Sequence, residues 1–264
     1  MSTVQVPQLT MGKAVRLRSR SGEWTGPTCG QAPGVLQTNL VIVPRSLSFD
    51  FMLFCQRNPK PCPLLEVTDV GSSEPRELAP GADLRTDLPR YRVYQHGELV
   101  DEPADIRRWW RDELVSFLLG CSFSFEEAML RAGLPVRHVE EGRNVPMYRT
   151  NISCKPAGVF QGPTVVSMRP LTVSQTIRAV EITSRYPKAH GAPIHVGNPA
   201  AIGIRDIHHP DYRDAVTIRG DEVPVFWACG VTPQAVLVET KPELVITHSP
   251  GCMFVTDVVA DALG

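Results

Sequence analysis

Short apolar runs separated by polar turns recur along the chain, and this pattern predicts many short elements rather than long helices. Residues 40–43 and 64–68 are mainly apolar and bounded by turn residues, so both are predicted to be buried strands. Residues 49–56, which lie between them, fit either a helix or a strand. Residues 71–86 are polar, and we expect a surface loop there.

Two helices are expected in the next part of the chain. Residues 105–119 carry apolar side chains at helical spacing and charged side chains on the other face, a pattern typical of an amphipathic helix. Ser124 and Glu127 have the spacing of a capping box, which predicts the start of a second helix. Gly133 and Pro135 are expected to end that helix.

Polar stretches at residues 140–146 and 219–224 bracket a segment with its own pattern. It contains two predicted strands, at residues 147–152 and 165–169, and a helix that starts at Thr172 with Gln175 as its capping partner. We therefore predict a main α/β domain, residues 1–142 and 223–264, with a mixed sheet in a three-layer arrangement. A smaller α+β domain, residues 143–222, is expected to be inserted into it.

The tail predicts a strand, a helix and a second strand. Residues 225–228 and 244–247 are the apolar runs, Gly230 permits a tight turn between them, and Thr232 is a good helix N-cap. Such a connection predicts that the two strands are parallel, with their carboxyl ends at the same edge of one sheet.

That edge would bring Cys229 and His248 together, because each directly follows one of the two strands. A helix N-terminus favours a thiolate, and the backbone N–H groups from Gly230 to Thr232 are suited to hold an oxyanion. The pair is therefore a candidate catalytic dyad. The alternative is a packed thiol beside a surface histidine.

Composition narrows the classes of function. The chain of 264 residues has a formal net charge of −1, so it lacks the positive field that nucleic-acid binding requires. No apolar run approaches the roughly 20 residues needed to cross a bilayer, and residues 1–10 do not resemble a secretion or organelle signal. We expect a cytoplasmic protein without nucleic-acid or membrane partners. The sequence does not decide whether the protein forms a homodimer.

The seven cysteines include no Cys-x-x-Cys pair, so we expect reduced thiols and neither a disulfide framework nor a zinc knuckle. His190 and His195 lie in a loop rich in glycine and proline, where they are candidates for acid–base catalysis. They are also candidate metal ligands, but no third ligand follows at a recognised spacing, and no metal is predicted. Without a phosphate-binding glycine motif, no nucleotide cofactor is expected either.

Two arginines are candidate anchors for a substrate carboxylate. Arg149 and Arg169 each lie on a predicted strand, and a guanidinium group can bind a carboxylate through two parallel hydrogen bonds. Arginines on half-exposed strands are more often solvated or paired structurally. A small-molecule carboxylate is accordingly the expected partner, bound by one of the two.

Five tracts of the sequence resemble the D-glutamate cyclase family, whose members are also described as hydro-lyases. The tracts are SGEWTGPT (residues 21–28), NPKPCP (58–63), GCSFSFE (120–126), HGAPIHVGNP (190–199) and FWACGVTPQ (226–234). The resemblance covers nearly the whole chain. It implies a lyase that removes water from D-glutamate to give 5-oxo-D-proline, an intramolecular amide formation.

On this resemblance, we expect His195 or His190 to move protons and Arg149 or Arg169 to bind the α-carboxylate. The N–H groups near Gly230 and Thr232 would hold the oxyanion, and Cys229 would form a polar wall. Further substrate contacts are expected within the matching tracts and the strand that carries Arg149. They are Ser122, Tyr148 and Asn198.

The chain departs from the family pattern at two positions. Asn198 stands where the family more usually has aspartate, and Cys252 stands where it more usually has histidine. Loss of a carboxylate or an imidazole changes how protons are carried. Two other functions therefore stay open, namely another hydro-lyase acting on a small hydroxy or amino acid, and a carboxylate-binding protein without catalysis.

Overall fold

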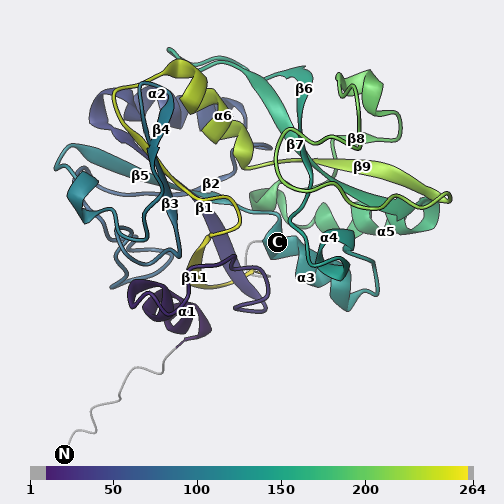
Figure 1. Cartoon of the computed structure of the whole chain (residues 1–264), viewed down its shortest axis with the longest axis horizontal. Helices are drawn as coiled ribbons and strands as arrows, with labels where there is room; N and C mark the ends of the chain where they lie inside the picture. Colours follow the sequence, from purple (N-terminus) through teal and green to yellow (C-terminus); the bar gives the residue numbers. More distant parts are fainter. Residues whose placement is uncertain (1–9, 261–264) are drawn as a thin grey trace, which may run out of the picture.

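The computed structural model describes residues 10–260, and its strands form two antiparallel sheets that lie side by side (Figure 1). The first sheet has the order β2-β5-β1-β10-β3-β4, with β11 also paired to β1. Its strands are β1 (Val35–Pro44), β2 (Leu64–Val67), β3 (Tyr91–Gln95), β4 (Glu98–Asp101), β5 (Leu114–Gly120), β10 (Val245–His248) and β11 (Phe254–Val259). The second sheet, in the order β6-β7-β9-β8, consists of β6 (Met147–Ser153), β7 (Pro163–Thr172), β9 (Glu222–Ala228) and β8 (His195–Val196).

The helices lie around and between these sheets. They are α1 (Met11–Arg20), α2 (Arg45–Arg57), α3 (Phe123–Arg131), α4 (Arg137–Glu140), α5 (Val173–Thr183) and α6 (Val231–Thr240), with short 3₁₀ turns η1 (Arg107–Trp109), η2 (Pro187–Ala189) and η3 (Pro199–Ile202). Among the residues from 10 to 260, no helix is both long and apolar enough to cross a membrane.

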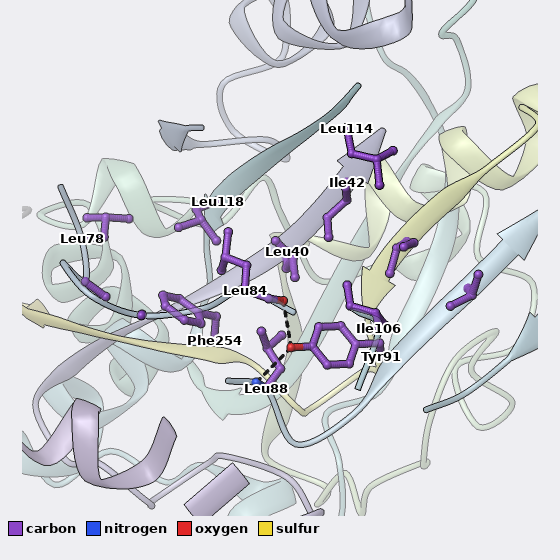
Figure 2. Close-up of a cluster of buried hydrophobic side chains, with 14 of the residues drawn as sticks. Leu40, Ile42, Leu78, Leu84, Leu88, Tyr91, Ile106, Leu114, Leu118 and Phe254 are labelled. Atoms are coloured by element: carbon purple, nitrogen blue, oxygen red, sulfur yellow. Dashed lines mark hydrogen bonds between the residues drawn. The ribbon is translucent and has the colours of Figure 1, made fainter. Parts of the chain in front are cut away.

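The first sheet is apolar on both faces, because β1 and β5 are buried along nearly their whole length. Phe51 and Phe54 of α2 cover one face. An irregular segment covers the other face, where Leu84 and Leu88 pack against Leu40 and their neighbours (Figure 2). The second face of this sheet is therefore closed by a loop-rich segment instead of a layer of helices.

The buried Tyr91 fixes that irregular segment. Its hydroxyl group donates to the carbonyl of Leu84 at 2.8 Å and accepts from the N–H of Leu88 at 3.2 Å (Figure 2). Buried backbone groups need such partners. One side chain on β3 thus satisfies two groups of a segment that has no regular structure.

The second sheet divides its side chains between two packed faces. Trp227 and Phe125 lie on the face covered by α3 and α5. Tyr148 and Phe226 lie on the opposite face, with η3 and the following loop packed over them. This division decides which candidate residues can meet.

Helix α6 lies between the two sheets (Figure 1). Val236 and Leu237 pack into the core of the first sheet, whereas Val231 and Ala235 pack against β6 and β7 of the second. A helix that is apolar on all sides is stable only when it is buried on all sides. The chain leaves the second sheet at β9 and enters the first at β10, with α6 as the connection.

Several local predictions are confirmed. Residues 40–43, 64–67, 147–152 and 165–169 are strands as predicted. Residues 49–56, for which the sequence left helix and strand open, are part of the helix α2. Helix α5 starts at Thr172 with the predicted capping box, in which Thr172 and Gln175 each accept a hydrogen bond from the other's backbone N–H group. These elements depend on local sequence alone.

Three predictions about helices are wrong. Residues 105–119 form the turn η1 and the strand β5, because residues 114–120 are buried on both faces in the centre of a sheet. Tertiary burial here overrides helical periodicity. Helix α3 follows Ser122 instead of Ser124, and the carboxylate of Glu127 accepts from the N–H of Gly34 instead of capping the helix. Thr232 is not an N-cap, since α6 begins after Gly230.

The predicted mixed sheet with parallel strands is also wrong. Every strand pair among residues 10–260 is antiparallel, and β9 and β10 belong to different sheets. A strand–helix–strand connection makes its two strands parallel only when both belong to the same sheet. Here α6 passes from one sheet to the other. The chain does combine helices and sheets as expected. The three-layer arrangement and the inserted domain of residues 143–222 stay predictions.

We predict that Tyr91→Phe lowers the free energy of unfolding by about 1–3 kcal/mol, because it leaves the buried Leu84 carbonyl and Leu88 N–H without a partner. Urea unfolding measures this loss. The control is Tyr94→Phe, whose side chain lines an open pocket, and there we expect a change within about 0.5 kcal/mol. Equal stability of Tyr91→Phe and the wild type would contradict the prediction.

Candidate functional site

A pocket of about 380 Å³ lies beside α6, where the two sheets approach each other. Its walls come from β3, β6, the loop at residues 211–213, one side of α6 from its first turn to its last, and Pro250 after β10. Three arginines line it, namely Arg92, Arg149 and Arg213. Two carboxylates, Asp211 and Glu239, also line it, so the pocket has an excess of positive charge.

The predicted anchor Arg149 lies at one end of this pocket. Its guanidinium group pairs with Glu239 of α6, and its backbone N–H donates to the Asp211 carboxylate at 2.8 Å. At the other end, Arg213 donates to the carbonyl of Pro250 at 2.8 Å. Arg92 lies on β3, where it is paired across the sheet with Thr247 of β10.

The second predicted anchor, Arg169, is fully buried and does not reach this pocket. It donates to the Glu126 carboxylate and to the hydroxyl groups of Ser122 and Ser167, each at 3.1 Å. Phe125 and Trp227 lie against its guanidinium group, 5.3 Å and 5.2 Å from the ring centres. Arg169 is therefore bound on several sides by groups of the protein itself, one of which is the predicted contact Ser122.

Glu126 stays ionised in this cluster although it is buried. Burial alone would raise its pKa, but the nearby His138 and Arg169 outweigh that effect and lower the pKa to about 2. The His138 Nε2 lies 3.4 Å from a Glu126 oxygen. The cluster is a compact ion pair that joins α3 to β7.

His248 lies between α6 and the first sheet. Its Nδ1 accepts from the N–H of Leu40 at 3.2 Å, and the side-chain nitrogen of Gln234 lies 3.0 Å from the same atom and 3.3 Å from Nε2. Burial lowers its pKa to about 4, so the ring is neutral near pH 7. Gln234 lines the arginine pocket, and it separates His248 from that pocket.

His190 is also buried and neutral, because burial lowers its pKa to about 4. Its Nδ1–H donates to the carbonyl of Lys60 at 2.8 Å. Lys60 in turn donates to the carbonyl of Ala192. These bonds hold the loop at residues 58–63 against the loop at residues 190–192, which gives His190 a structural role.

The Cys229–His248 dyad predicted at one sheet edge is wrong, because the strands before these residues lie in separate sheets. The Cys229 thiol contacts the sulfur of Met147 at 3.4 Å. Burial raises its pKa to about 11, and this effect outweighs the N–H of Val231, which lowers it. A thiolate is thus not favoured here, although the residue directly precedes a helix.

The first turn of α6 fits tightly against its surroundings. A Cβ atom on Gly230 would lie 2.2 Å from the side-chain nitrogen of Asn39, so only glycine fits. Thr232 accepts from the N–H of Val165 at 2.9 Å and donates to the carbonyl of the same residue at 3.2 Å. Its own N–H donates to the carbonyl of Cys229. At least one of the predicted oxyanion donors, the N–H of Thr232, therefore already donates a hydrogen bond within the protein.

Three other candidates lie on the far face of the second sheet. His195 is paired with Phe226 and stacks near its ring, and Tyr148 packs on the same side with its hydroxyl group bonded to the carbonyl of Ile207. The Asn198 side chain caps the turn η3. Because β8 is three strands from β6, His195 lies roughly 14 Å or more from the pocket strand.

Sequence reasoning found Arg149 but missed Arg92, Arg213, Asp211 and Gln234. These residues come from three segments that are separate along the chain, and no single motif contains them. One signal was present, since Gln234 lies within the tract FWACGVTPQ. Within residues 10–260, no three histidine, cysteine or acidic side chains are arranged to hold a metal ion.

Comparison with known proteins gives the class of this two-sheet protein. Relatives that carry hydro-lyase as a provisional name occur in Stutzerimonas stutzeri, 61% identical over 95% of both chains, and in Bacillus licheniformis, 62% identical over 95% of both. A third, from Rubrobacter xylanophilus, is 64% identical over 92% of this chain and 93% of its own. These relationships place the chain among the lyases.

The family follows from a second comparison. A family model described as D-glutamate cyclase matches residues 115–257, more than half of the chain. The chain belongs to the D-glutamate cyclase family. A nitrogen repressor-like protein from Methanococcus jannaschii aligns over 95% of this chain and all of its own, with 9% identity and a TM-score of 0.39. That likeness is too weak to support an inference.

We predict that the protein loses stability between pH 6.5 and pH 4. His190 and His248 have native pKa values near 4, below the ordinary 6.5, so the unfolded chain binds more protons in this range. Their contribution is fully present above pH 6.5 and is lost as the pH falls toward 4. The expected loss is on the order of 1–3 kcal/mol per histidine.

Urea unfolding at several pH values tests this, with His248→Gln as the variant and the exposed His208→Gln as its control. The pH dependence should be smaller in His248→Gln and unchanged in His208→Gln. Identical pH dependence in all three proteins would show that His248 is not the titrating group.

Proposed function

We propose that the protein converts D-glutamate to 5-oxo-D-proline and water in the pocket beside α6. Membership of the D-glutamate cyclase family indicates the reaction. The charges in the pocket are the reason for placing the reaction at this site. Glutamate has two carboxylates and one ammonium group, and the pocket offers three guanidinium groups together with Asp211 and Glu239.

Cyclisation forms a bond between the nitrogen and the γ-carbon and breaks one carbon–oxygen bond. The ammonium group loses two protons, and both end on the departing oxygen as water, so no net proton is consumed. Amine and carboxylate belong to one molecule, and oriented intramolecular reactions reach effective molarities of about 10⁵ M or more. The enzyme must therefore mainly fold the substrate and direct its protons.

Pocket residues are suited to both tasks. Arg149 binds the α-carboxylate, and the neighbouring Asp211 and Glu239 hold the ammonium group and accept its first proton. Burial raises the pKa of Tyr212, which lines the same pocket, so its hydroxyl group is protonated and available to donate to the departing oxygen. The buried histidines are not needed for this route.

NMR of the purified protein with D-glutamate, L-glutamate and each 5-oxoproline tests the function. We expect interconversion of D-glutamate and 5-oxo-D-proline, with slower turnover of the L-forms. Turnover of a different hydroxy or amino acid, with none of these four compounds, would instead identify another hydro-lyase. Binding of D-glutamate without turnover would identify a carboxylate-binding protein.

We predict that Arg149→Lys raises KM for D-glutamate by about tenfold and changes kcat little, because lysine keeps the charge but cannot bind a carboxylate with two parallel hydrogen bonds. Steady-state kinetics measure both constants. The matched control is Arg178→Lys, since Arg178 forms an exposed ion pair on α5. A collapse of kcat at constant KM would assign Arg149 to the chemical step instead.

We predict that His195→Asn and Cys229→Ser each change kcat by no more than about threefold. His195 lies on the opposite face of the second sheet, and the Cys229 thiol is not activated. A proton-transferring histidine would instead lower kcat by roughly 10²-fold when replaced. A fall of that size in either variant would move the site from the arginine pocket to that residue.

A further inference from the structure

We propose that Arg92 and Arg213 form a second carboxylate-binding subsite, which makes the pocket selective for dicarboxylates. Asp211 lies beside the backbone of Arg149, and Tyr212 is paired with Met147. Arg213 therefore lies further from Arg149 along β6. Pro250, which accepts a hydrogen bond from Arg213, follows β10 by two residues, and Arg92 is paired with β10. The fold thus brings the two arginines to one end.

These arginines have few anionic partners. The Nε of Arg92 is buried without a hydrogen bond, and the nearest carboxylate oxygen, on Glu102, is 3.5 Å away. That oxygen accepts a hydrogen bond from Ser249 at 2.6 Å. Arg213 donates to the uncharged carbonyl of Pro250. These two cations thus share the Glu102 carboxylate, with Asp214 also acting on Arg213, and a bound anion would stabilise both arginines further.

The other end differs in charge. Arg149 has Glu239 as its ion-pair partner and Asp211 beside its backbone. The Arg149 end is therefore suited to an amino-acid group with both charges, and the Arg92–Arg213 end to a bare carboxylate. Burial lowers the pKa of Arg213, and the nearby Arg92 adds to this effect.

The backbone conformation of Arg213 is one that is often found at ligand-binding sites. Its φ of 67° lies in the left-handed region, which costs free energy for a residue other than glycine. Strained residues of this kind persist where the surroundings fix them, and they concentrate at ligand sites. The bond to Pro250 holds the guanidinium group of Arg213, which lines the pocket.

The inference rests on the proposed function for its substrate class. The amino-acid end of D-glutamate would occupy the Arg149 end, and its side-chain carboxylate would bind Arg92 and Arg213. That carboxylate is the group that reacts, so the subsite would also position the γ-carbon for attack. Shorter or monocarboxylate amino acids would leave the two arginines without an anion.

Isothermal titration calorimetry on the full-length protein tests the subsite with two probes. Glutarate has two carboxylates and no amine, and valerate has the same five carbons but one carboxylate. We expect glutarate to bind wild type at least tenfold more tightly than valerate. Arg92→Gln and Arg213→Gln should each remove most of this preference, and Arg178→Gln on α5 should keep it.

Each variant is first compared with wild type by thermal unfolding, and Arg213→Lys is included because it keeps the charge and should retain part of the preference. Unchanged glutarate binding in both glutamine variants would overturn the proposal. So would a wild type that does not distinguish the two probes.

Failure of the subsite and failure of the proposed function give different results. If the two arginines govern glutarate binding but NMR shows no interconversion of D-glutamate and 5-oxo-D-proline, the subsite stands and the cyclase function falls. If D-glutamate is cyclised with an unchanged KM in Arg92→Gln and Arg213→Gln, the function stands and the subsite is wrong.

Discussion

The burial of α6 is the constraint on which the rest of the structure depends. A helix with apolar residues on all sides must have protein on all sides, and here the two sheets supply it. The arginine pocket lies beside this helix, and Gln234 and Ala235 of α6 line it together with Met147 of β6.

Close contact at two glycines makes this arrangement possible. A Cβ on Gly230 would collide with Asn39, and a Cβ on Gly120 would lie 1.7 Å from the carbonyl oxygen of Lys188. The Asn39 side chain donates to the Gly120 carbonyl at 2.7 Å, so one amide joins β1, the end of β5 and the start of α6. Both glycines lie in tracts that resemble the family, and packing explains why these positions need glycine.

Local signals in the sequence predicted the elements that depend on nearest neighbours, such as the α5 capping box and the strand that carries Arg149. The same local signals gave the wrong element where a segment is buried on both of its faces. An apolar run such as residues 114–120 fits a buried strand as well as a helix, and only its place at the sheet centre decides. The pocket was mostly beyond prediction, because Arg92 and Arg213 meet through β10 and a strained loop rather than through a motif.

The two arginines that the sequence offered as equal candidates differ in what surrounds them. Arg169 has Glu126, Ser122 and Ser167 as partners and two aromatic rings against it, so binding an external anion would first require breaking a buried ion pair. Arg149 pairs with a half-exposed carboxylate across an open pocket, where solvent already weakens the interaction. A ligand can replace that partner at little cost. Burial, rather than residue type or strand position, therefore separates the structural arginine from the one suited to bind a substrate.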